Sequence, residues 1–177
     1  MVKIKGNAFS DDYLTTLLHR IKESPHLADT GDEGHKGFNV TFSDPENMFN
    51  SFPEFKTYFE AIRDPDCNLF HIVALVIGSG GIIERHKDKE LNVYNYPKIT
   101  NVLYVHVPDD VTGGQVIFED GSTLSPETNL LVTFPSTFEH SVTQVTTNDK
   151  RVCLVCEQYK ELTFFTNKYN ISKIVKG

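Results

Sequence analysis

Residues 69–88 read LFHIVALVIGSGGIIERHKD, and this stretch sets the expected fold class. Its Val-, Ile- and Leu-rich half predicts a buried β-strand over 69–77, and the glycines that follow predict a turn into a second strand over 82–86. Comparable segments recur at 100–107, 115–119, 129–134, 140–146, 151–158 and 162–168. Because no helical period separates these segments, the pattern favours an antiparallel barrel or jelly roll over a parallel sheet, whose crossovers need helices.

The chain before this stretch has helical periodicity. Leu14, Leu17, Leu18 and Ile21 keep the spacing of one buried helix face, and Ser10 is the predicted N-cap. This segment therefore predicts a packing helix near the N-terminus.

A second helix is predicted from the capping-box spacing of Ser51 and Glu54, with Pro53 in its first turn. Its apolar face would consist of Phe55, Tyr58, Phe59 and Ile62. Between the two helices, residues 26–50 are rich in Gly, Asp and Asn and predict a loop that could cover a site, with one short strand near 38–42. We therefore expect a mainly β protein with one domain over 1–177, in which a helical support over about 1–66 packs against a β core over about 67–177.

The composition limits the class of protein. The chain has 24 acidic and 17 basic side chains, a formal charge of −7, with 39% hydrophobic and 23% charged residues. These values fit a globular domain and exclude a collagen, a coiled coil and a disulfide-rich miniprotein. The acidic balance argues against a general nucleic-acid binder, because phosphate neutralisation needs a basic face. No stretch approaches the roughly 18 consecutive apolar residues of a membrane span, and no signal-peptide core is present, so we expect a cytoplasmic protein without membrane partners.

The three cysteines are Cys67, Cys153 and Cys156. The last two lie three residues apart in a predicted strand, and residues at that spacing face opposite sides of a sheet. The pair is therefore badly placed to bind one metal or to form a disulfide, and we interpret all three as structural thiols.

Polar residues at predicted strand ends are the candidate metal ligands. His86 and Asp88 have a two-residue spacing directly after a strand and a glycine-rich turn, although the spacing by itself is a weak signal, because a chain of this composition yields about half such a match by chance. His140 begins a later predicted strand and is the best third ligand, with His106 as its main rival. Two imidazoles and one carboxylate suit non-haem Fe(II), because they leave adjacent coordination positions open. A core histidine with a hydrogen-bond partner is the preferred interpretation of His71, and no role is assigned to the histidines at 19, 26 and 35.

Arg151 opens an otherwise apolar strand. A guanidinium that enters a core needs an anionic partner, and its planar fork matches a carboxylate at two points. The alternative is a strand-end arginine whose head group reaches solvent, and the neighbouring Lys150 could compete for the same anion.

Taken in chain order, these features resemble the 2-oxoglutarate/Fe(II)-dependent dioxygenases, and most closely their prolyl-4-hydroxylase-like branch. The resemblance covers roughly residues 69–160. It rests on the interval between His-x-Asp and the distal His, on the Gly-Gly-x-x-x-Phe strand and on a basic residue eleven positions after the distal His. The segments that carry it are Gly78-Ser79-Gly80-Gly81, His86-Lys87-Asp88, Val102-Leu103-Tyr104-Val105, Gly113-Gly114-Gln115-Val116-Ile117-Phe118, Phe134-Pro135-Ser136, His140-Ser141-Val142 and Arg151.

The resemblance implies a double-stranded β-helix core in which His86, Asp88 and His140 are catalytic and hold Fe(II). It also implies that Arg151 and Tyr104 bind the distal carboxylate of 2-oxoglutarate. The implied activity is an oxidoreductase that uses O2, with ascorbate as a candidate reductant. It would couple decarboxylation of 2-oxoglutarate to succinate with hydroxylation of a prolyl or other amino-acid side chain, in a peptide or free.

Some residues depart from the family pattern. Ile83 stands where the branch often has a tyrosine, and Cys153 stands where many relatives have a serine that contacts 2-oxoglutarate. The main alternative is a cupin-type metal-binding barrel without 2-oxoglutarate chemistry, which would not need Arg151 or Tyr104. An AlkB-like nucleic-acid demethylase is disfavoured by the acidic charge. We expect the loops at 26–50 and 87–99 to contribute to substrate recognition, whereas the oligomeric state stays open.

Overall fold

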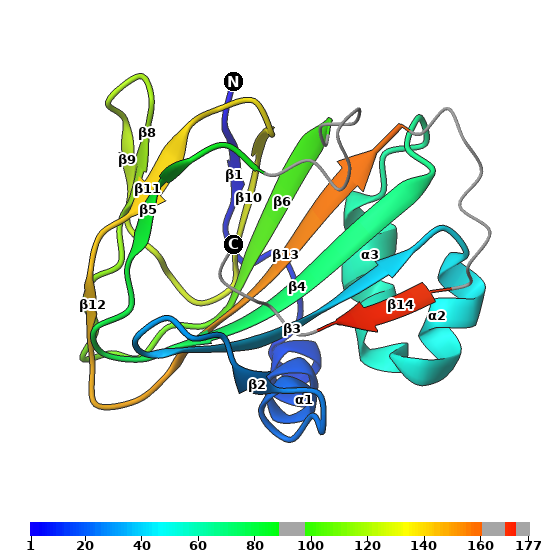
Figure 1. Ribbon diagram of the computed structural model, residues 1–177, viewed down its shortest axis with the longest axis horizontal. Coiled ribbons are helices and arrows are strands. Elements are labelled where there is room, and N and C mark those ends of the chain that lie inside the picture. The colour runs from blue at the N-terminus through cyan, green and yellow to red at the C-terminus, as the bar shows by residue number, and fades with distance from the viewer. Residues whose placement is uncertain (89–97, 161–168, 173–177) are drawn as a thin grey trace.

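The computed structural model describes residues 1–88, 98–160 and 169–172, and within them two antiparallel sheets face each other (Figure 1). The larger sheet has the strand order β1 (Lys3–Lys5), β10 (Leu130–Pro135), β6 (Ile99–His106), β13 (Arg151–Tyr159), β4 (Leu69–Ile77), β3 (His35–Phe42) and β14 (Tyr169–Ser172), with β2 (Ala28–Asp29) paired to β3. The smaller sheet has the order β5 (Ile83–His86), β11 (His140–Val142), β8 (Val116–Phe118) and β9 (Thr123–Leu124). A separate pair consists of β12 (Val145–Thr146) and β7 (Thr112–Gly113).

This arrangement confirms the predicted antiparallel jelly roll. Six of the predicted strands correspond to β4, β5, β6, β8, β10 and β13, with ends within one or two residues of the prediction. The predicted strand at 140–146 is instead divided between β11 and β12. Its pairing with β8 ends before Val145, which forms backbone hydrogen bonds with Gly80 and Gly81. The predicted strand at 162–168 lies outside the described residues.

Helix α1 (Asp11–Lys22) begins where the sequence predicts. The Ser10 side chain accepts a hydrogen bond from the backbone N–H of Tyr13 at 3.2 Å, which satisfies one of the free donors of the first turn. Asp11 and Asp12 lie in the first turn and Lys22 in the last, so these charges oppose the helix dipole.

The second helix differs from the prediction. Helix α2 (Pro45–Ser51) ends at Ser51, a short 3-10 helix η1 spans Pro53–Phe55, and α3 follows as Lys56–Ile62. The predicted capping box is therefore wrong, because Ser51 closes one helix instead of starting the next. The true start signal is the Asp-Pro pair at 44–45: the Asp44 carboxylate accepts a hydrogen bond from the backbone N–H of Asn47. The expected loop at 26–50 thus contains α2 and the strand β3, which is longer than predicted.

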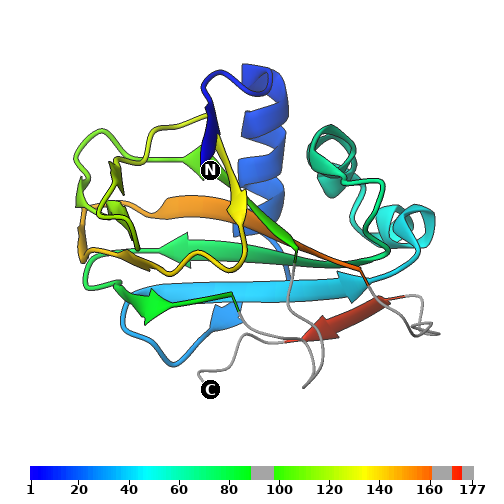
Figure 2. The same ribbon diagram turned by 90° about the horizontal axis from the view of Figure 1, so that it is seen from above.

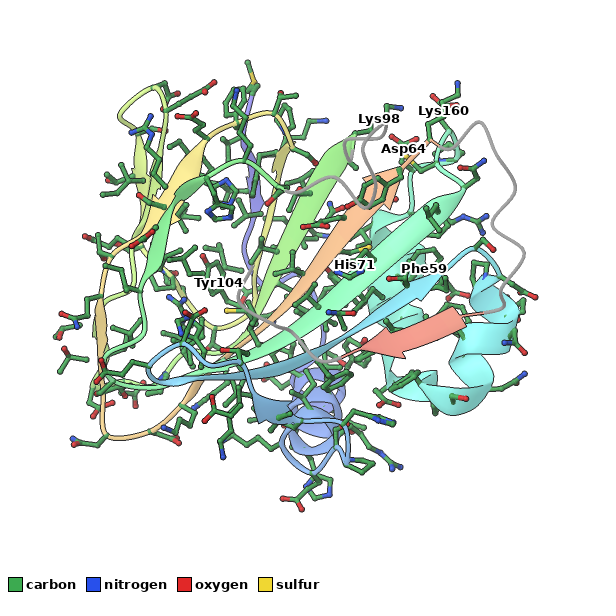
Figure 3. The ribbon with its side chains drawn as sticks, viewed as in Figure 1. Phe59, Asp64, His71, Lys98, Tyr104 and Lys160 are labelled. Carbon is green, nitrogen blue, oxygen red and sulfur yellow. The ribbon has the colours of Figure 1, made fainter. Side chains whose placement is uncertain are left out.

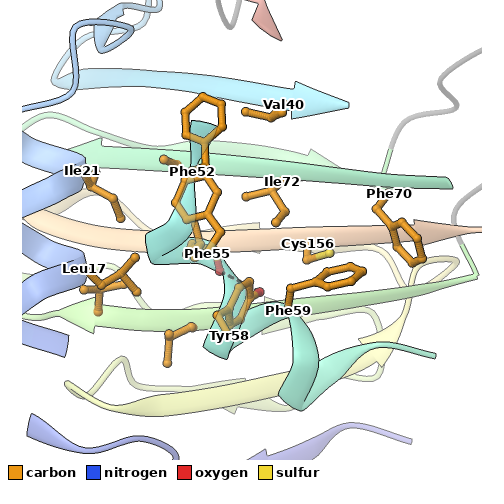
Figure 4. Packing of buried hydrophobic residues seen from close by; sticks show 14 of the residues in the cluster. Leu17, Ile21, Val40, Phe52, Phe55, Tyr58, Phe59, Phe70, Ile72 and Cys156 are labelled. Carbon is orange, nitrogen blue, oxygen red and sulfur yellow. Dashed lines mark hydrogen bonds between the residues drawn. The ribbon is translucent and has the colours of Figure 1, made fainter. Parts of the chain in front are cut away.

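The helices cover one face of the larger sheet, and the smaller sheet lies toward its other face (Figure 2). The outer core joins the helices to the sheet, as Figure 4 shows for Leu17, Ile21, Phe59 and Ile72. A second core between the sheets includes Tyr104, Val116, Phe118, Leu130, Val132, Phe134, Val142 and Cys153. Cys153 and Cys156 belong to different cores, and all three cysteines are free, which confirms their interpretation as structural thiols.

None of the helices in the described ranges is long and apolar enough to cross a membrane.

The outer core predicts a large cost for truncating Phe59. This residue is 1% exposed, and its ring meets that of Phe70 edge to face at a centroid distance of 4.7 Å. We expect Phe59→Ala to lower the free energy of unfolding by about 3–5 kcal/mol, because it removes a buried ring and leaves a cavity. Urea unfolding followed by circular dichroism measures the change. Ile4→Ala is the matched control, since Ile4 is 55% exposed, and equal destabilisation by both variants would contradict the packing described here.

Candidate metal centre and the cavity beside it

Three potential ligands meet between the two sheets. His86 ends β5 and lies opposite His140, the first residue of β11, while Asp88 follows two residues after His86. The Oδ1 atom of Asp88 is 3.9 Å from Nε2 of His86 and 3.7 Å from Nε2 of His140. One ligand atom from each residue lies within 4.8 Å of the other two, so the three side chains could hold a single metal ion. The structure thus brings together the three residues predicted as ligands.

Both imidazoles are oriented by backbone carbonyls. Nδ1 of His86 lies 2.8 Å from the carbonyl oxygen of Glu84, and Nδ1 of His140 lies 3.0 Å from that of Phe138. A carbonyl only accepts hydrogen bonds, so each Nδ1 carries the proton and each Nε2 keeps its lone pair for a metal. Burial lowers the pKa of His140, which favours the neutral form that a metal requires.

Asp88 is held by the Thr100 hydroxyl, which the sequence did not single out for this role. Its Oδ2 atom accepts a hydrogen bond from the Thr100 hydroxyl, which in turn lies 2.8 Å from the Ser136 hydroxyl. All three side chains are buried. Because Oδ2 is engaged in this way, Oδ1 is left to face the two histidines. Thr100 and Asp88 are twelve residues apart in sequence, so no local pattern could have paired them.

A cavity of about 170 Å³ extends from this cluster between the sheets. Most of its lining is aliphatic or aromatic: Val73, Leu75, Ile77, Ile83, Val102, Tyr104, Val116, Phe118, Leu124, Val132, Phe134, Val142 and Val155. The polar and ionisable groups in the lining are few, and they comprise the three potential ligands together with Thr100, Tyr104, Arg151, Cys153 and Glu157. An apolar cavity with a few placed polar groups is typical of a small-molecule site.

Arg151 supplies a buried positive charge to this cavity. It is 2% exposed, and its Nη1 donates a hydrogen bond to the carbonyl oxygen of Gly114 at 2.8 Å. Its Nε has no hydrogen-bond partner, and no carboxylate of the described residues forms an ion pair with the guanidinium. The guanidinium also lies over the ring of Tyr104, 5.7 Å from its centroid, and burial raises the pKa of the Tyr104 hydroxyl, which therefore stays a donor. These groups fit an anion that enters the cavity.

Glycine is required at 114 by this close approach. Gly114 has a φ of +69°, and a Cβ atom there would lie 2.6 Å from Nη1 of Arg151. A larger residue would strain the backbone and displace the guanidinium. The Gly-Gly-x-x-x-Phe segment therefore contributes to the anion site as well as to the turn before β8.

The rival candidates lie elsewhere. His106 pairs with Asp149, with Nε2 3.5 Å from Oδ2, and is not part of the cluster. Lys150 is exposed and does not line the cavity. Nδ1 of His71 and the Thr41 hydroxyl share a hydrogen bond of 2.8 Å, and burial lowers the pKa of His71 to about 4. This confirms His71 as a neutral histidine with a hydrogen-bond partner.

Glu157 is a cavity residue that the sequence analysis missed. Burial, with a smaller contribution from neighbouring Asp88, raises the pKa of its carboxyl group to about 8. The Tyr159 hydroxyl donates a hydrogen bond to its Oε2 at 2.8 Å. Alternation along β13 could have placed Glu157 on the same face as Arg151, but only the facing strands identify that face as a cavity wall.

Comparison with known proteins gives an independent result. Residues 70–156 match the sequence model of the 2OG-Fe(II) oxygenase superfamily. No curated protein matches the chain. Among solved structures, a prolyl-4-hydroxylase from Pseudomonas putida is similar, with 19% identity, a TM-score of 0.63 and coverage of 90% of this chain and 92% of that chain.

Two further structures share the fold. A prolyl hydroxylase from Trichoplax adhaerens, in complex with a hypoxia inducible factor peptide fragment, has 15% identity and a TM-score of 0.64, covering 90% of this chain and 83% of that chain. HygX from Streptomyces hygroscopicus, with nickel, 2-oxoglutarate and hygromycin B bound, has 9% identity and a TM-score of 0.62, covering 92% and 84%. These likenesses confirm the double-stranded β-helix fold.

The geometry predicts divalent metal binding that depends on Asp88 and, less strongly, on Thr100. We expect Asp88→Ala to abolish binding of Mn(II), because it removes the only carboxylate of the cluster. Thr100→Val should weaken binding by about 10- to 100-fold, because it frees the carboxylate to rotate. Isothermal titration calorimetry measures both effects. Thr123→Val is the control, because Thr123 on β9 is exposed, and wild-type affinity in Asp88→Ala would contradict the site.

Proposed function

Because this chain belongs to the 2OG-Fe(II) oxygenase superfamily, whose members are 2-oxoglutarate-dependent dioxygenases, we propose that it hydroxylates a C–H bond of a prolyl or other amino-acid side chain, in a peptide or in a free amino acid. The observation that carries this proposal is the pairing of a His-Asp-His cluster with a buried, incompletely bonded arginine in the same cavity. The first suits iron, and the second suits an organic anion.

His86, Asp88 and His140 would hold the iron. Two neutral imidazoles and one carboxylate, brought together on one side of a point, form the donor set that non-haem Fe(II) oxygenases use. When bound with 2-oxoglutarate and O2, the iron would supply the oxidising power for a reaction in which one oxygen atom enters the substrate C–H bond and the other enters succinate, with release of CO2. The protein orients the three ligands: the carbonyl oxygens of Glu84 and Phe138 hold the two imidazoles, and the hydroxyl of Thr100 holds the carboxylate.

Arg151 and Tyr104 would bind the distal carboxylate of 2-oxoglutarate. The fit rests on an orphaned donor: Arg151 is buried, its Nη1 donates to the carbonyl oxygen of Gly114, and its Nε has no hydrogen-bond partner among the described residues. A carboxylate would supply the missing acceptor and the missing charge, and the Tyr104 hydroxyl lines the same cavity as a further donor. The aliphatic walls around them exclude water and strengthen this ion pair.

The cupin-type alternative is disfavoured by the same arginine. A metal-binding barrel that takes no organic anion has no use for a buried guanidinium without a carboxylate, because burying that charge carries a desolvation cost.

We also propose that the N-terminal helices and the β core act as one domain, since Leu17 and Phe59 share a single apolar core with strands β3, β4 and β13.

The function predicts a specific effect of Arg151 on co-substrate binding. Arg151→Ala should raise the 2-oxoglutarate concentration for half-maximal succinate formation at least tenfold, because the distal carboxylate loses its charged partner. Arg151→Lys should give an intermediate value, because lysine keeps the charge and loses the two-point geometry. Lys150→Ala is the control and should behave as wild type. An effect confined to Lys150→Ala would assign the anion to that residue instead.

The reaction itself is tested by mass spectrometry. The chain is incubated with Fe(II), 2-oxoglutarate and a panel of amino acids and peptides, and products are screened for a gain of one oxygen atom together with succinate. We expect His140→Ala to form neither product, because the remaining two ligands no longer hold the iron. Undiminished succinate formation by this variant would contradict the assigned site.

A further inference from the structure

Glu157 is an ionisable group of the cavity that the proposed function leaves unused. It lines the cavity wall with Val155 and Asp88, and no basic side chain of the described residues forms an ion pair with it. Its single protein hydrogen bond in these ranges comes from the Tyr159 hydroxyl, which fixes Oε2 and leaves Oε1 for another donor. A carboxyl group held in this way on the cavity wall, with one oxygen left over, points to a ligand group.

The strand register places Glu157 at the level of the metal cluster. Glu157 lies opposite Thr100 on β6 and opposite His71 on β4. Directly opposed residues of antiparallel strands project from the same face, and Thr100 is the residue whose hydroxyl binds Asp88. A polar row therefore crosses the inner face of the sheet beside the candidate metal site, from Thr41 and His71 to Glu157 and Thr100.

Arg151 lies at the other end of the same strand. Six residues separate it from Glu157, which corresponds to about 20 Å of extended chain. Tyr104, which lies opposite Cys153, belongs to the Arg151 end, and Figure 3 shows Tyr104 and His71 at different levels along the sheet. The anion site lies at the Arg151 end, and Glu157 lies beside the cluster, at the side of the cavity away from Arg151. That side is left for the substrate.

The charges of the site indicate what kind of substrate fits there. Under the proposed function, the charges of Fe(II), Asp88, the 2-oxoglutarate dianion and Arg151 cancel. No charge of the site is then left to balance an ionised Glu157, and a charge without a partner is costly in a cavity of low polarity. A positively charged group on the substrate would remove this cost and would take up the free Oε1.

We propose that Glu157 is a specificity-determining residue that binds a protonated nitrogen of the substrate, an ammonium or a guanidinium group, close to the carbon that is oxidised. This inference rests on the proposed function and narrows its substrate class. The same chemistry is offered by the α-ammonium group of a free amino acid and by the side chain of a lysine or arginine residue in a peptide. Glu157 orients the substrate through this contact, and Tyr159 holds the carboxylate in place.

Equilibrium binding to the Mn(II) and 2-oxoglutarate-loaded protein tests this without turnover. The probes are pairs matched in size: free lysine with norleucine and free arginine with citrulline, each as the free amino acid and as the central residue of a blocked tripeptide. Each free amino acid is also tested with its α-amino group acetylated. We expect the cationic member of at least one pair, or a free amino acid relative to its acetylated form, to bind at least tenfold more tightly.

Glu157→Gln should abolish this preference, because glutamine keeps the shape and removes the charge. Its affinities for Mn(II) and for 2-oxoglutarate should match those of the wild type, which also confirms that it is folded. Tyr159→Phe should reduce the preference in part, since the carboxylate is less well positioned. Glu127→Gln, on the exposed surface, is the control and should keep the full preference. A preference carried only by free amino acids assigns the α-ammonium group, and one that persists in the tripeptides assigns the side chain.

Two outcomes would overturn the inference: equal binding of cationic and neutral probes by the wild type, or a preference that persists in Glu157→Gln. Failure of the proposed function has a different signature. In that case the Mn(II)-loaded wild type would not bind 2-oxoglutarate, and no succinate would form with Fe(II), whatever Glu157 contributes.

Discussion

The alternation of side chains along β13 is the constraint on which the rest of the structure depends. This strand lies between β4 and β6, so both of its edges are hydrogen-bonded and both of its faces are covered. One set of residues, Val152, Leu154 and Cys156, packs against the helices, while the other set, from Arg151 to Glu157, lines the cavity. A shift of the register by one residue would exchange the two sets. It would place Arg151 and Glu157 in the helical core.

The cavity combines two requirements that oppose each other. Its aliphatic walls exclude water, which strengthens ionic and metal interactions, and the same walls make every unpaired charge costly. The chain meets this conflict with local hydrogen bonds at the candidate metal site, where Thr100 satisfies one oxygen of Asp88 and backbone carbonyls satisfy both imidazoles. At Arg151 the protein satisfies only part of the guanidinium, so the remaining capacity is available to a ligand.

Elements with a strong local signal could be predicted from the sequence. Helix α1 has a side-chain cap and a regular apolar face, which predict its start and its buried side, and β4 and β13 are long apolar runs whose predicted ends are nearly correct. The segment around α2 and α3 was predicted less well, because Ser51 and Glu54 have capping-box spacing but the backbone already turns at Asp44-Pro45. Spacing alone does not reveal which of two nearby caps the chain uses. Strands of two or three residues, such as β2 and β7, are too short for any alternation to be visible.

The sequence by itself determined the jelly-roll class, the strand-end positions of His86, Asp88 and His140, and the unusual entry of Arg151 into an apolar strand, because these follow from period and local composition. Only the tertiary structure decided which of the rival residues face the same space. His106 and Lys150 lie outside the cluster and the cavity, whereas Thr100 and Glu157 approach the Asp88 carboxylate from other strands. The physical reason is that contacts between distant strands depend on the register of the sheets, which is set by the packing of both faces together.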